Sequence, residues 1–160
     1  MNIFYLSDNP REAAELQYNK HVVKMVLETA QLLCTTHHEL LGDDADVPYK
    51  STHKNHPSTV WARQSANNYE WLFHHFIGLC EEYERRYNKV HLSYTKCKDK
   101  VNLVPKVLNH TGLTKMPQCM PEEYHDECSV QAYWNYYIND KSEIANQNTE
   151  EVYAYRPQAK

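Results

Sequence analysis

The chain has 160 residues, a formal net charge of −4 and only three glycines. This length is sufficient for one domain with a substantial hydrophobic core. The negative net charge excludes a surface that is basic throughout, so a nucleic acid or other polyanion would have to bind at a local basic patch. The scarcity of glycine argues against a turn-rich β architecture and against a glycine-rich phosphate loop.

Five cysteines are present, and no two of them form a C-x-x-C pair. Cys34 and Cys80 fall within apolar helical runs, so we expect them to be buried thiols. The sequence shows no signal peptide and no apolar run long enough to span a bilayer. We therefore expect a cytoplasmic protein in a reducing environment, with no membrane partner.

The first predicted element is a short extended arm, residues 2–6, packed on the body of the protein. Asn9 followed by Pro10 predicts the start of a helix, because a capping side chain precedes a proline in the first turn. This first helix is expected to be short and to end near Tyr18.

A long helix is predicted from residue 19 to residue 41, with Gly42 as its C-terminal stop. Residues 43–57 are polar, contain two prolines and predict a loop. Ser58 then opens a second long helix, whose apolar positions recur at helical spacing as far as a charged segment at residues 81–86.

A third long helix is predicted over residues 94–108, where Pro105 must break or bend it. Residues 109–123 predict a loop, and residues 127–145 predict a last helix rich in aromatic side chains. No convincing alternating strand follows the first few residues.

These elements predict an all-α fold, a single-domain bundle of about four to five helices with a short N-terminal extended arm. The helical domain is expected to span residues 1–145. The remaining residues, 146–160, are rich in Asn, Gln and Glu and are expected to form a mobile tail.

The most informative feature is a polar stripe along the predicted helix 19–41. Its members follow one another at spacings of three or four, which stacks their side chains on one helix face: His21, Lys24, Glu28, Gln31, Thr35 and His38. Most of the remaining circumference is apolar, and such a helix is normally buried. The stripe predicts a reaction site; the alternative is the solvated side of an amphipathic helix.

Glu28 is the strongest catalytic candidate, because a carboxylate among apolar neighbours is partly desolvated and suits acid–base catalysis. Lys24 and His21, one and two turns earlier, are predicted to act with it. Gln31, next on the stripe, is a predicted substrate contact. The alternative is an exposed i, i+4 ion pair between Glu28 and Lys24, which would contribute little to stability.

A second cluster precedes the predicted helix at Ser58. Lys54, His56 and Arg63 lie close to a helix N-terminus, which attracts anions through its free N–H groups and its dipole. The cluster predicts a phosphate clamp; the alternative is a polar loop with an ordinary serine cap.

Ten histidines invite a search for a metal site, but no H-E-x-x-H arrangement and no paired Cys/His set is present. Asp43, Asp44 and Asp46 do not match a calcium-binding loop. We expect no metal and no cofactor.

A third cluster is aromatic and lies on the last predicted helix. Tyr136 and Tyr137, followed by Lys141, predict a surface on which bases stack while hydroxyl and ammonium groups reach phosphates. The alternative is core packing, which is the usual role of such aromatic residues.

His21 and Glu28 are separated by six residues on an early helix, and His56 precedes an aromatic position at Trp61. The long helix that follows ends in Leu-Cys-Glu-Glu, and residues 133–137 read Tyr-Trp-Asn-Tyr-Tyr. In these features the chain resembles the phage pyrimidine-dimer DNA glycosylases of the endonuclease V type, and uncharacterised phage and bacterial proteins grouped with them. The likeness covers most of residues 15–142.

The resemblance implies a small all-helical repair enzyme that excises a base from damaged DNA in the bacterial or host cytoplasm. It implies that Glu28 is catalytic and that His21 lies in the active site. In this family an amine forms a Schiff base with the sugar C1′, and β-elimination then breaks the strand. Lys24, Arg63 and Lys141 would contact phosphates.

Two departures from the family pattern matter. The family uses the α-amine of a small second residue, whereas Asn2 is too bulky for ready removal of the initiator methionine. Lys24 is then an alternative amine, and activation of water by Glu28 is another route. The arginines that flank the family's glutamate are replaced here by Leu27 and Gln31, which weakens the case for tight duplex binding.

The leading hypothesis is therefore a DNA repair-type N-glycosylase, with or without AP-lyase activity, that acts on a damaged or modified pyrimidine in DNA or in a nucleotide. The first alternative is a non-catalytic accessory protein that binds nucleic acid or another protein. The second alternative is a metal-dependent hydrolase that uses His53, His56 and the aspartates of the 43–57 loop.

Overall fold

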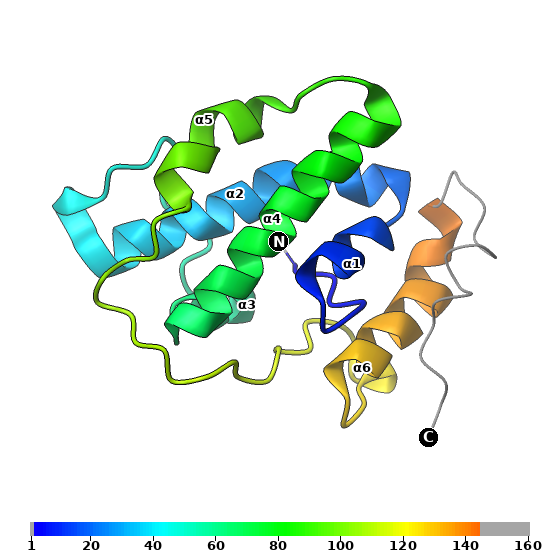
Figure 1. Ribbon diagram of the computed structural model, residues 1–160. Helices are drawn as coiled ribbons and strands as arrows, with labels where there is room; N and C mark the ends of the chain where they lie inside the picture. Colours follow the sequence, from blue (N-terminus) through cyan, green and yellow to red (C-terminus); the bar gives the residue numbers. More distant parts are fainter. Residues whose placement is uncertain (1, 145–160) are drawn as a thin grey trace.

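The computed structural model describes residues 2–144 and contains no strand within that range. Six α-helices follow one another along the chain: α1 (Pro10–Glu15), α2 (Asn19–Leu41), α3 (Pro57–Ala62), α4 (Ala66–Tyr87), α5 (Leu92–Val101) and α6 (Ser129–Tyr136). The long helices α2 and α4 pack across each other, α1 packs on α4, and α5 packs on α2 (Figure 1). The prediction of an all-α fold is confirmed. The predicted tail, residues 146–160, lies outside the described residues.

The N-terminal arm is extended and buried, as predicted. Ile3 and Leu6 are each 1% exposed, because they pack into the core between the helices. The indole N–H of Trp134 in α6 donates to the carbonyl of Leu6 at 2.8 Å. The arm thus joins the beginning of the chain to its last helix.

The first two helices begin and end for local reasons. Asn9 caps α1, since its side-chain oxygen accepts the backbone N–H groups of Arg11 and Glu12. α1 stops at Glu15, earlier than predicted, and a short turn leads into α2. α2 has the predicted bounds, and Gly42 ends it with a φ of +56°, a backbone conformation that glycine adopts most easily.

The prediction of one long helix from Ser58 is wrong, because the chain turns between α3 and α4. Ser65 begins α4 by accepting the N–H of Asn68 at 3.0 Å, and its own hydroxyl donates to the carbonyl of Gly112 at 2.9 Å. The side-chain amide of Asn68 donates to the carbonyl of Trp61, which also accepts the backbone N–H of Gln64 in the turn after α3. A cap that is stabilised by a distant loop is therefore the reason for the break.

The predicted helix over residues 94–108 is shorter and begins earlier, since α5 ends at Val101, before Pro105. The last helix begins at Ser129, and its α-helical part ends at Tyr136. A π-helical turn, Tyr137–Lys141, continues it.

Cys34 and Cys80 are buried free thiols, as predicted, and Cys97 is a third buried thiol. Within residues 2–144, no helix combines the length and hydropathy that crossing a bilayer requires.

Candidate active site

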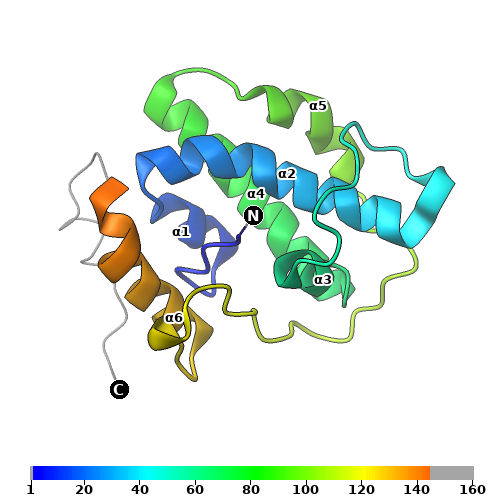
Figure 2. The ribbon, with the colours of Figure 1, turned by 180° about the vertical axis from the view of Figure 1, so that it is seen from behind.

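A cavity of about 230 Å³ opens where the N-terminal arm, α2, the start of α3 and the C-terminal helix meet. Ten residues line it: Asn2, Phe4, His21, Lys24, Met25, Glu28, His56, Cys119, Tyr136 and Lys141. In Figure 2 the N-terminal end lies in front of α2, between α3 and α6. The cavity therefore combines side chains from both ends of the described chain.

α2 supplies the polar centre of the cavity through the first half of its stripe. Lys24 Nζ lies 3.6 Å from Glu28 Oε1, and the Lys24 side chain is 65% exposed while that of Glu28 is 18% exposed. Glu28 Oε2 is buried and has no hydrogen-bond partner among the described residues. An unpaired buried carboxylate oxygen destabilises a fold, so its presence at a cavity wall is typical of a group reserved for a ligand.

His21 forms the inner wall beside Glu28 and is only 6% exposed. Its ring stacks on Phe4 with centroids 4.3 Å apart, and its Nδ1 lies 2.7 Å from the hydroxyl of Tyr137. Burial, reinforced by the charges of Lys141 and Lys24, lowers the pKa of His21 from 6.5 to about 4. The imidazole is consequently neutral at neutral pH, so it can form a hydrogen bond without adding a charge to the cavity.

His56 faces the same cavity and also caps α3. Its Nδ1 accepts the backbone N–H of Ser58 at 3.1 Å, so in the neutral ring the proton resides on Nε2. Partial burial lowers the pKa of His56 below its ordinary value. His56 thus contributes an N–H donor beside the carboxylate of Glu28.

Tyr136 and Lys141 close the cavity from the C-terminal helix. Lys141 Nζ lies 4.8 Å from the centre of the Tyr136 ring and 3.3 Å from a carboxylate oxygen of Asp140. The hydroxyl of Tyr136 is the largest contributor that raises the pKa of Lys141, with further support from Asp140. Lys141 is therefore a stable cation at the cavity wall, suited to an anionic group.

Asn2 and Cys119 were not singled out as cavity-lining residues in the sequence. The side-chain amide of Asn2 donates to the carbonyl of Cys119 at 2.9 Å, and its oxygen accepts from the hydroxyl of Tyr133 at 2.9 Å. The first pair is separated by 117 positions along the chain. No local sequence pattern predicts a contact between residues so far apart in the chain. For Asn2, the family's use of its second residue is the signal that could have indicated a place at the site.

Four predicted site residues lie outside the cavity. Arg63 Nη1 donates to the carbonyl of Lys54 at 2.7 Å, so this pair fixes the loop before α3, and the predicted clamp brings only His56 to the cavity. Gln31 is half-buried farther along α2. Tyr137 is completely buried behind His21 and does not offer a stacking surface.

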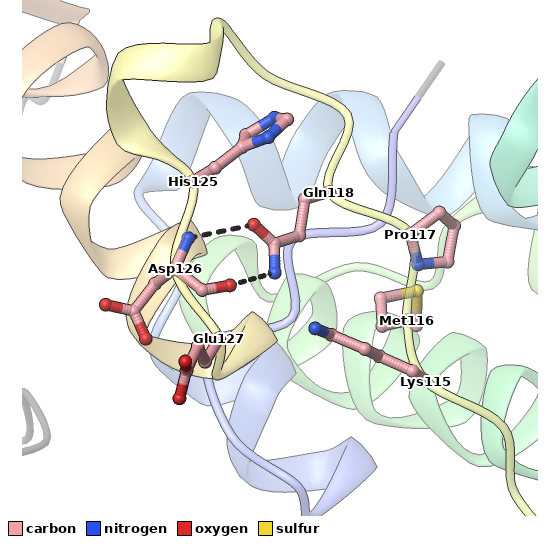
Figure 3. A pocket seen from close by; sticks show the side chains of 7 residues that line it. All are labelled: Lys115, Met116, Pro117, Gln118, His125, Asp126 and Glu127. Carbon is pink, nitrogen blue, oxygen red and sulfur yellow. Dashed lines mark hydrogen bonds between the residues drawn. The ribbon is translucent and has the colours of Figure 1, made fainter.

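A wider hollow of about 620 Å³ is lined by residues 115–118 and 125–127 (Figure 3). Gln118 accepts the backbone N–H of Asp126 at 3.0 Å and donates to the carbonyl of the same residue at 2.5 Å. His125 donates to the carbonyl of Met120 at 3.0 Å. These polar groups stabilise their own loop, so the smaller cavity around Glu28 is the better candidate for chemistry.

The described residues do not bring three or more His, Cys, Asp or Glu side chains together in an arrangement that suits a metal ion. His53 contacts the hydroxyl of Thr52, and Asp46 pairs with Lys100 at 2.5 Å. The alternative of a metal-dependent hydrolase built on His53, His56 and the nearby aspartates therefore gains no support from the described part of the chain.

Acidification is expected to destabilise this fold through two buried histidines. Burial lowers the pKa of His75, like that of His21, from 6.5 to about 4. Between pH 6.5 and pH 4 these histidines bind more protons in the unfolded chain than in the folded chain. The free energy of unfolding therefore falls as the pH falls. We expect a loss of about 2 kcal/mol per histidine from pH 7 to pH 5, measured by urea unfolding.

His75→Gln is the matched variant for this measurement, because His75 lies away from the cavity and donates from Nδ1 to the carbonyl of Pro10. The variant should lose the share of the pH dependence that His75 contributes, about 2 kcal/mol between pH 7 and pH 5. Equal stability of the parent protein at pH 7 and pH 5 would contradict the assignment of both rings as buried neutral groups.

Fold and cavity together define a class: a small all-helical protein whose pocket combines a carboxylate, two imidazoles and two ammonium groups, the groups of acid–base catalysis. The family model described as pyrimidine dimer DNA glycosylase matches residues 1–95, and the chain belongs to this family of DNA repair enzymes. No curated protein and no solved structure gives a match. The matched range includes Glu28 and His56, whereas Cys119, Tyr136 and Lys141 lie beyond it.

Proposed function

We propose that this protein is a DNA glycosylase that excises a damaged or modified pyrimidine, with Glu28 as its central acid–base group. The observation that carries the proposal is the buried, unpaired Oε2 of Glu28 at the wall of a cavity. Family membership supports the reaction class. DNA contact would be local, since the chain as a whole carries a net charge of −4.

Lys24 and Lys141 supply the local positive charge at the cavity. Their ammonium groups belong to two different elements that line the same cavity. Phosphates on either side of a damaged nucleotide would be bound there, and the nucleotide would be distorted or flipped toward Glu28. Binding is then expected to weaken with added salt, because each neutralised phosphate releases counterions.

In the excision step, the bond between the sugar C1′ and the base nitrogen breaks, and the base leaves with the electron pair. The Glu28 carboxylate stabilises the positive charge that develops on the sugar and accepts a proton from the attacking nucleophile. A neutral His21 or His56 can donate a hydrogen bond to the leaving base. These three groups face one cavity.

Lys24 is the amine that we propose for an additional AP-lyase step, because Glu28 Oε1 lies 3.6 Å from its Nζ and can accept its proton. The amine would attack C1′, and loss of water from the carbinolamine would give a Schiff base. Removal of a C2′ proton would then expel the 3′-phosphate, and water would release the protein.

Borohydride trapping tests both parts of this proposal. The protein is incubated with abasic DNA and with ultraviolet-irradiated DNA, and a covalent adduct is sought by electrophoresis and peptide mapping. We expect an adduct at Lys24 that Lys24→Arg abolishes. Base release without an adduct would leave a glycosylase in which Glu28 activates water. Binding with neither base release nor strand scission would instead favour the non-catalytic accessory protein.

A further inference from the structure

Tyr137 is the predicted substrate contact whose location differs most from expectation. Its side chain is completely buried, and its hydroxyl accepts the backbone N–H of Tyr18 at 2.8 Å. Its ring stacks on that of Tyr18 with centroids 4.3 Å apart and planes 7° apart. Tyr137 is thus a rigid part of the core, directly behind the cavity wall.

The same hydroxyl lies 2.7 Å from Nδ1 of His21. Phe4 covers one face of the His21 ring, with ring planes only 11° apart. Because one edge of the imidazole is engaged by Tyr137 and one face by Phe4, rotation of the ring is restricted. Nε2 is the nitrogen that remains for the cavity, on the wall that His21 shares with Glu28.

The backbone around Tyr137 suits this arrangement. A π-helical turn begins at Tyr137 and ends at Lys141, which itself lines the cavity. Such turns are rare and frequently occur at functional sites, because the wider turn redirects the side chains that follow it. One short segment therefore supports His21 from behind and carries Lys141 to the front, and this segment lies beyond the 1–95 range of the family match.

We propose that Tyr137 is a positioning residue, whose hydroxyl holds the His21 imidazole with Nε2 toward the cavity beside Glu28. Tyr137 itself touches no substrate and acts through His21. The catalytic consequence rests on the proposed glycosylase function, whereas the effect on the His21 ring does not.

Tyr137→Phe is the variant that tests this role, because it keeps the stacked ring and removes only the hydroxyl. Histidine side chains are followed by NMR during a pH titration, with base release from ultraviolet-irradiated DNA measured in parallel. Lys24, Lys141, Glu28 and His56 also face His21 across the cavity and are unchanged in this variant. We expect the pKa of His21 to move by roughly half a unit or more, and kcat to fall about tenfold with KM within about twofold.

The chain contains a matched control at some distance from the cavity. The hydroxyl of Tyr69 is also buried and lies 2.7 Å from a histidine nitrogen, Nε2 of His37, and it donates to the carbonyl of Val101. Tyr69→Phe removes an equivalent hydroxyl and is expected to change the His37 signals. It should leave both the titration of His21 and the rate of base release unchanged.

A double-mutant cycle with His21→Ala supplies the second test. If Tyr137 acts through His21, then Tyr137→Phe causes no further loss of kcat when His21 is already absent. A full additional loss in that background, or an unchanged His21 titration in Tyr137→Phe alone, overturns the proposal. A changed His21 titration in a protein that releases no base from any DNA tested supports the positioning role and refutes the glycosylase function instead.

Discussion

Glu28→Gln is expected to reduce the rate of base release by about 10³-fold while leaving the fold intact. Glutamine has nearly the same shape but can neither accept the proton nor stabilise a developing positive charge. The substitution also removes the charge from a buried oxygen that has no partner among the described residues. The free energy of unfolding, measured by thermal unfolding, should therefore fall by no more than about 0.5 kcal/mol. The rate is measured with ultraviolet-irradiated DNA, and stability is measured by circular dichroism.

Glu39→Gln is the control for this experiment, because Glu39 is an exposed carboxylate on the same helix. It makes one long contact, 3.4 Å, with the hydroxyl of Ser51, and it does not line the cavity. We expect its rate to match that of the parent protein. Substantial turnover by Glu28→Gln, with the control also active, would contradict a central role for Glu28.

Arg86→Ala is expected to destabilise the protein by about 3 kcal/mol, which would lower its melting temperature by roughly 10 °C. Arg86 lies at the end of α4 with a side chain only 11% exposed, and it pairs at 2.8 Å with Glu82, whose side chain is 8% exposed. Its guanidinium also donates to the backbone carbonyls of Glu15 and Gln17 at the corner between α1 and α2. Removing it leaves the two carbonyls without this donor and leaves the buried carboxylate of Glu82 paired only with the exposed guanidinium of Arg85.

Arg85→Ala separates the effect of burial from the effect of charge. Arg85 pairs with the same carboxylate of Glu82 at 2.6 Å, but its side chain is 68% exposed. Exposed ion pairs contribute little, so we expect a loss of less than about 1 kcal/mol. Equal effects of the two substitutions in thermal unfolding would show that the buried corner of α1 and α2 does not depend on Arg86.

The corner that Arg86 stabilises also holds the start of α2, the helix that carries the polar stripe. Asn19, the first residue of α2, accepts from the same guanidinium at 3.0 Å. His21 follows two residues later. Arg86→Ala is therefore expected to displace the beginning of the polar stripe, although Arg86 does not line the cavity.

The predictions that agree best with the structure depend on interactions between residues close in the chain. The start of α1 follows from the cap at Asn9, and the end of α2 follows from Gly42. The stripe on α2 follows from helical spacing, which brings Lys24 and Glu28 together without any tertiary contact. These features require only a helix, and the helix itself is favoured by the apolar residues around the stripe.

The predictions that differ depend on contacts between distant segments. The break between α3 and α4 is stabilised by the hydrogen bond from the Ser65 hydroxyl to the carbonyl of Gly112. A local sequence pattern does not predict a contact between these distant residues. The exposed stacking surface expected at Tyr137 is instead core, because Tyr18 and His21 meet it across more than a hundred positions of the chain. A helical aromatic residue has the same spacing whether it faces solvent or the core.

From its sequence alone, this protein is an all-helical chain with a carboxylate, an ammonium group and an imidazole on one face of an early helix. Helical spacing and capping involve residues only a few positions apart, so both can be predicted from the sequence. Only the tertiary structure determines that this face closes into a cavity with Asn2, His56 and Lys141. The formation of this cavity depends on which distant surfaces bury one another. Burial is a property of the whole packed chain rather than of any one segment.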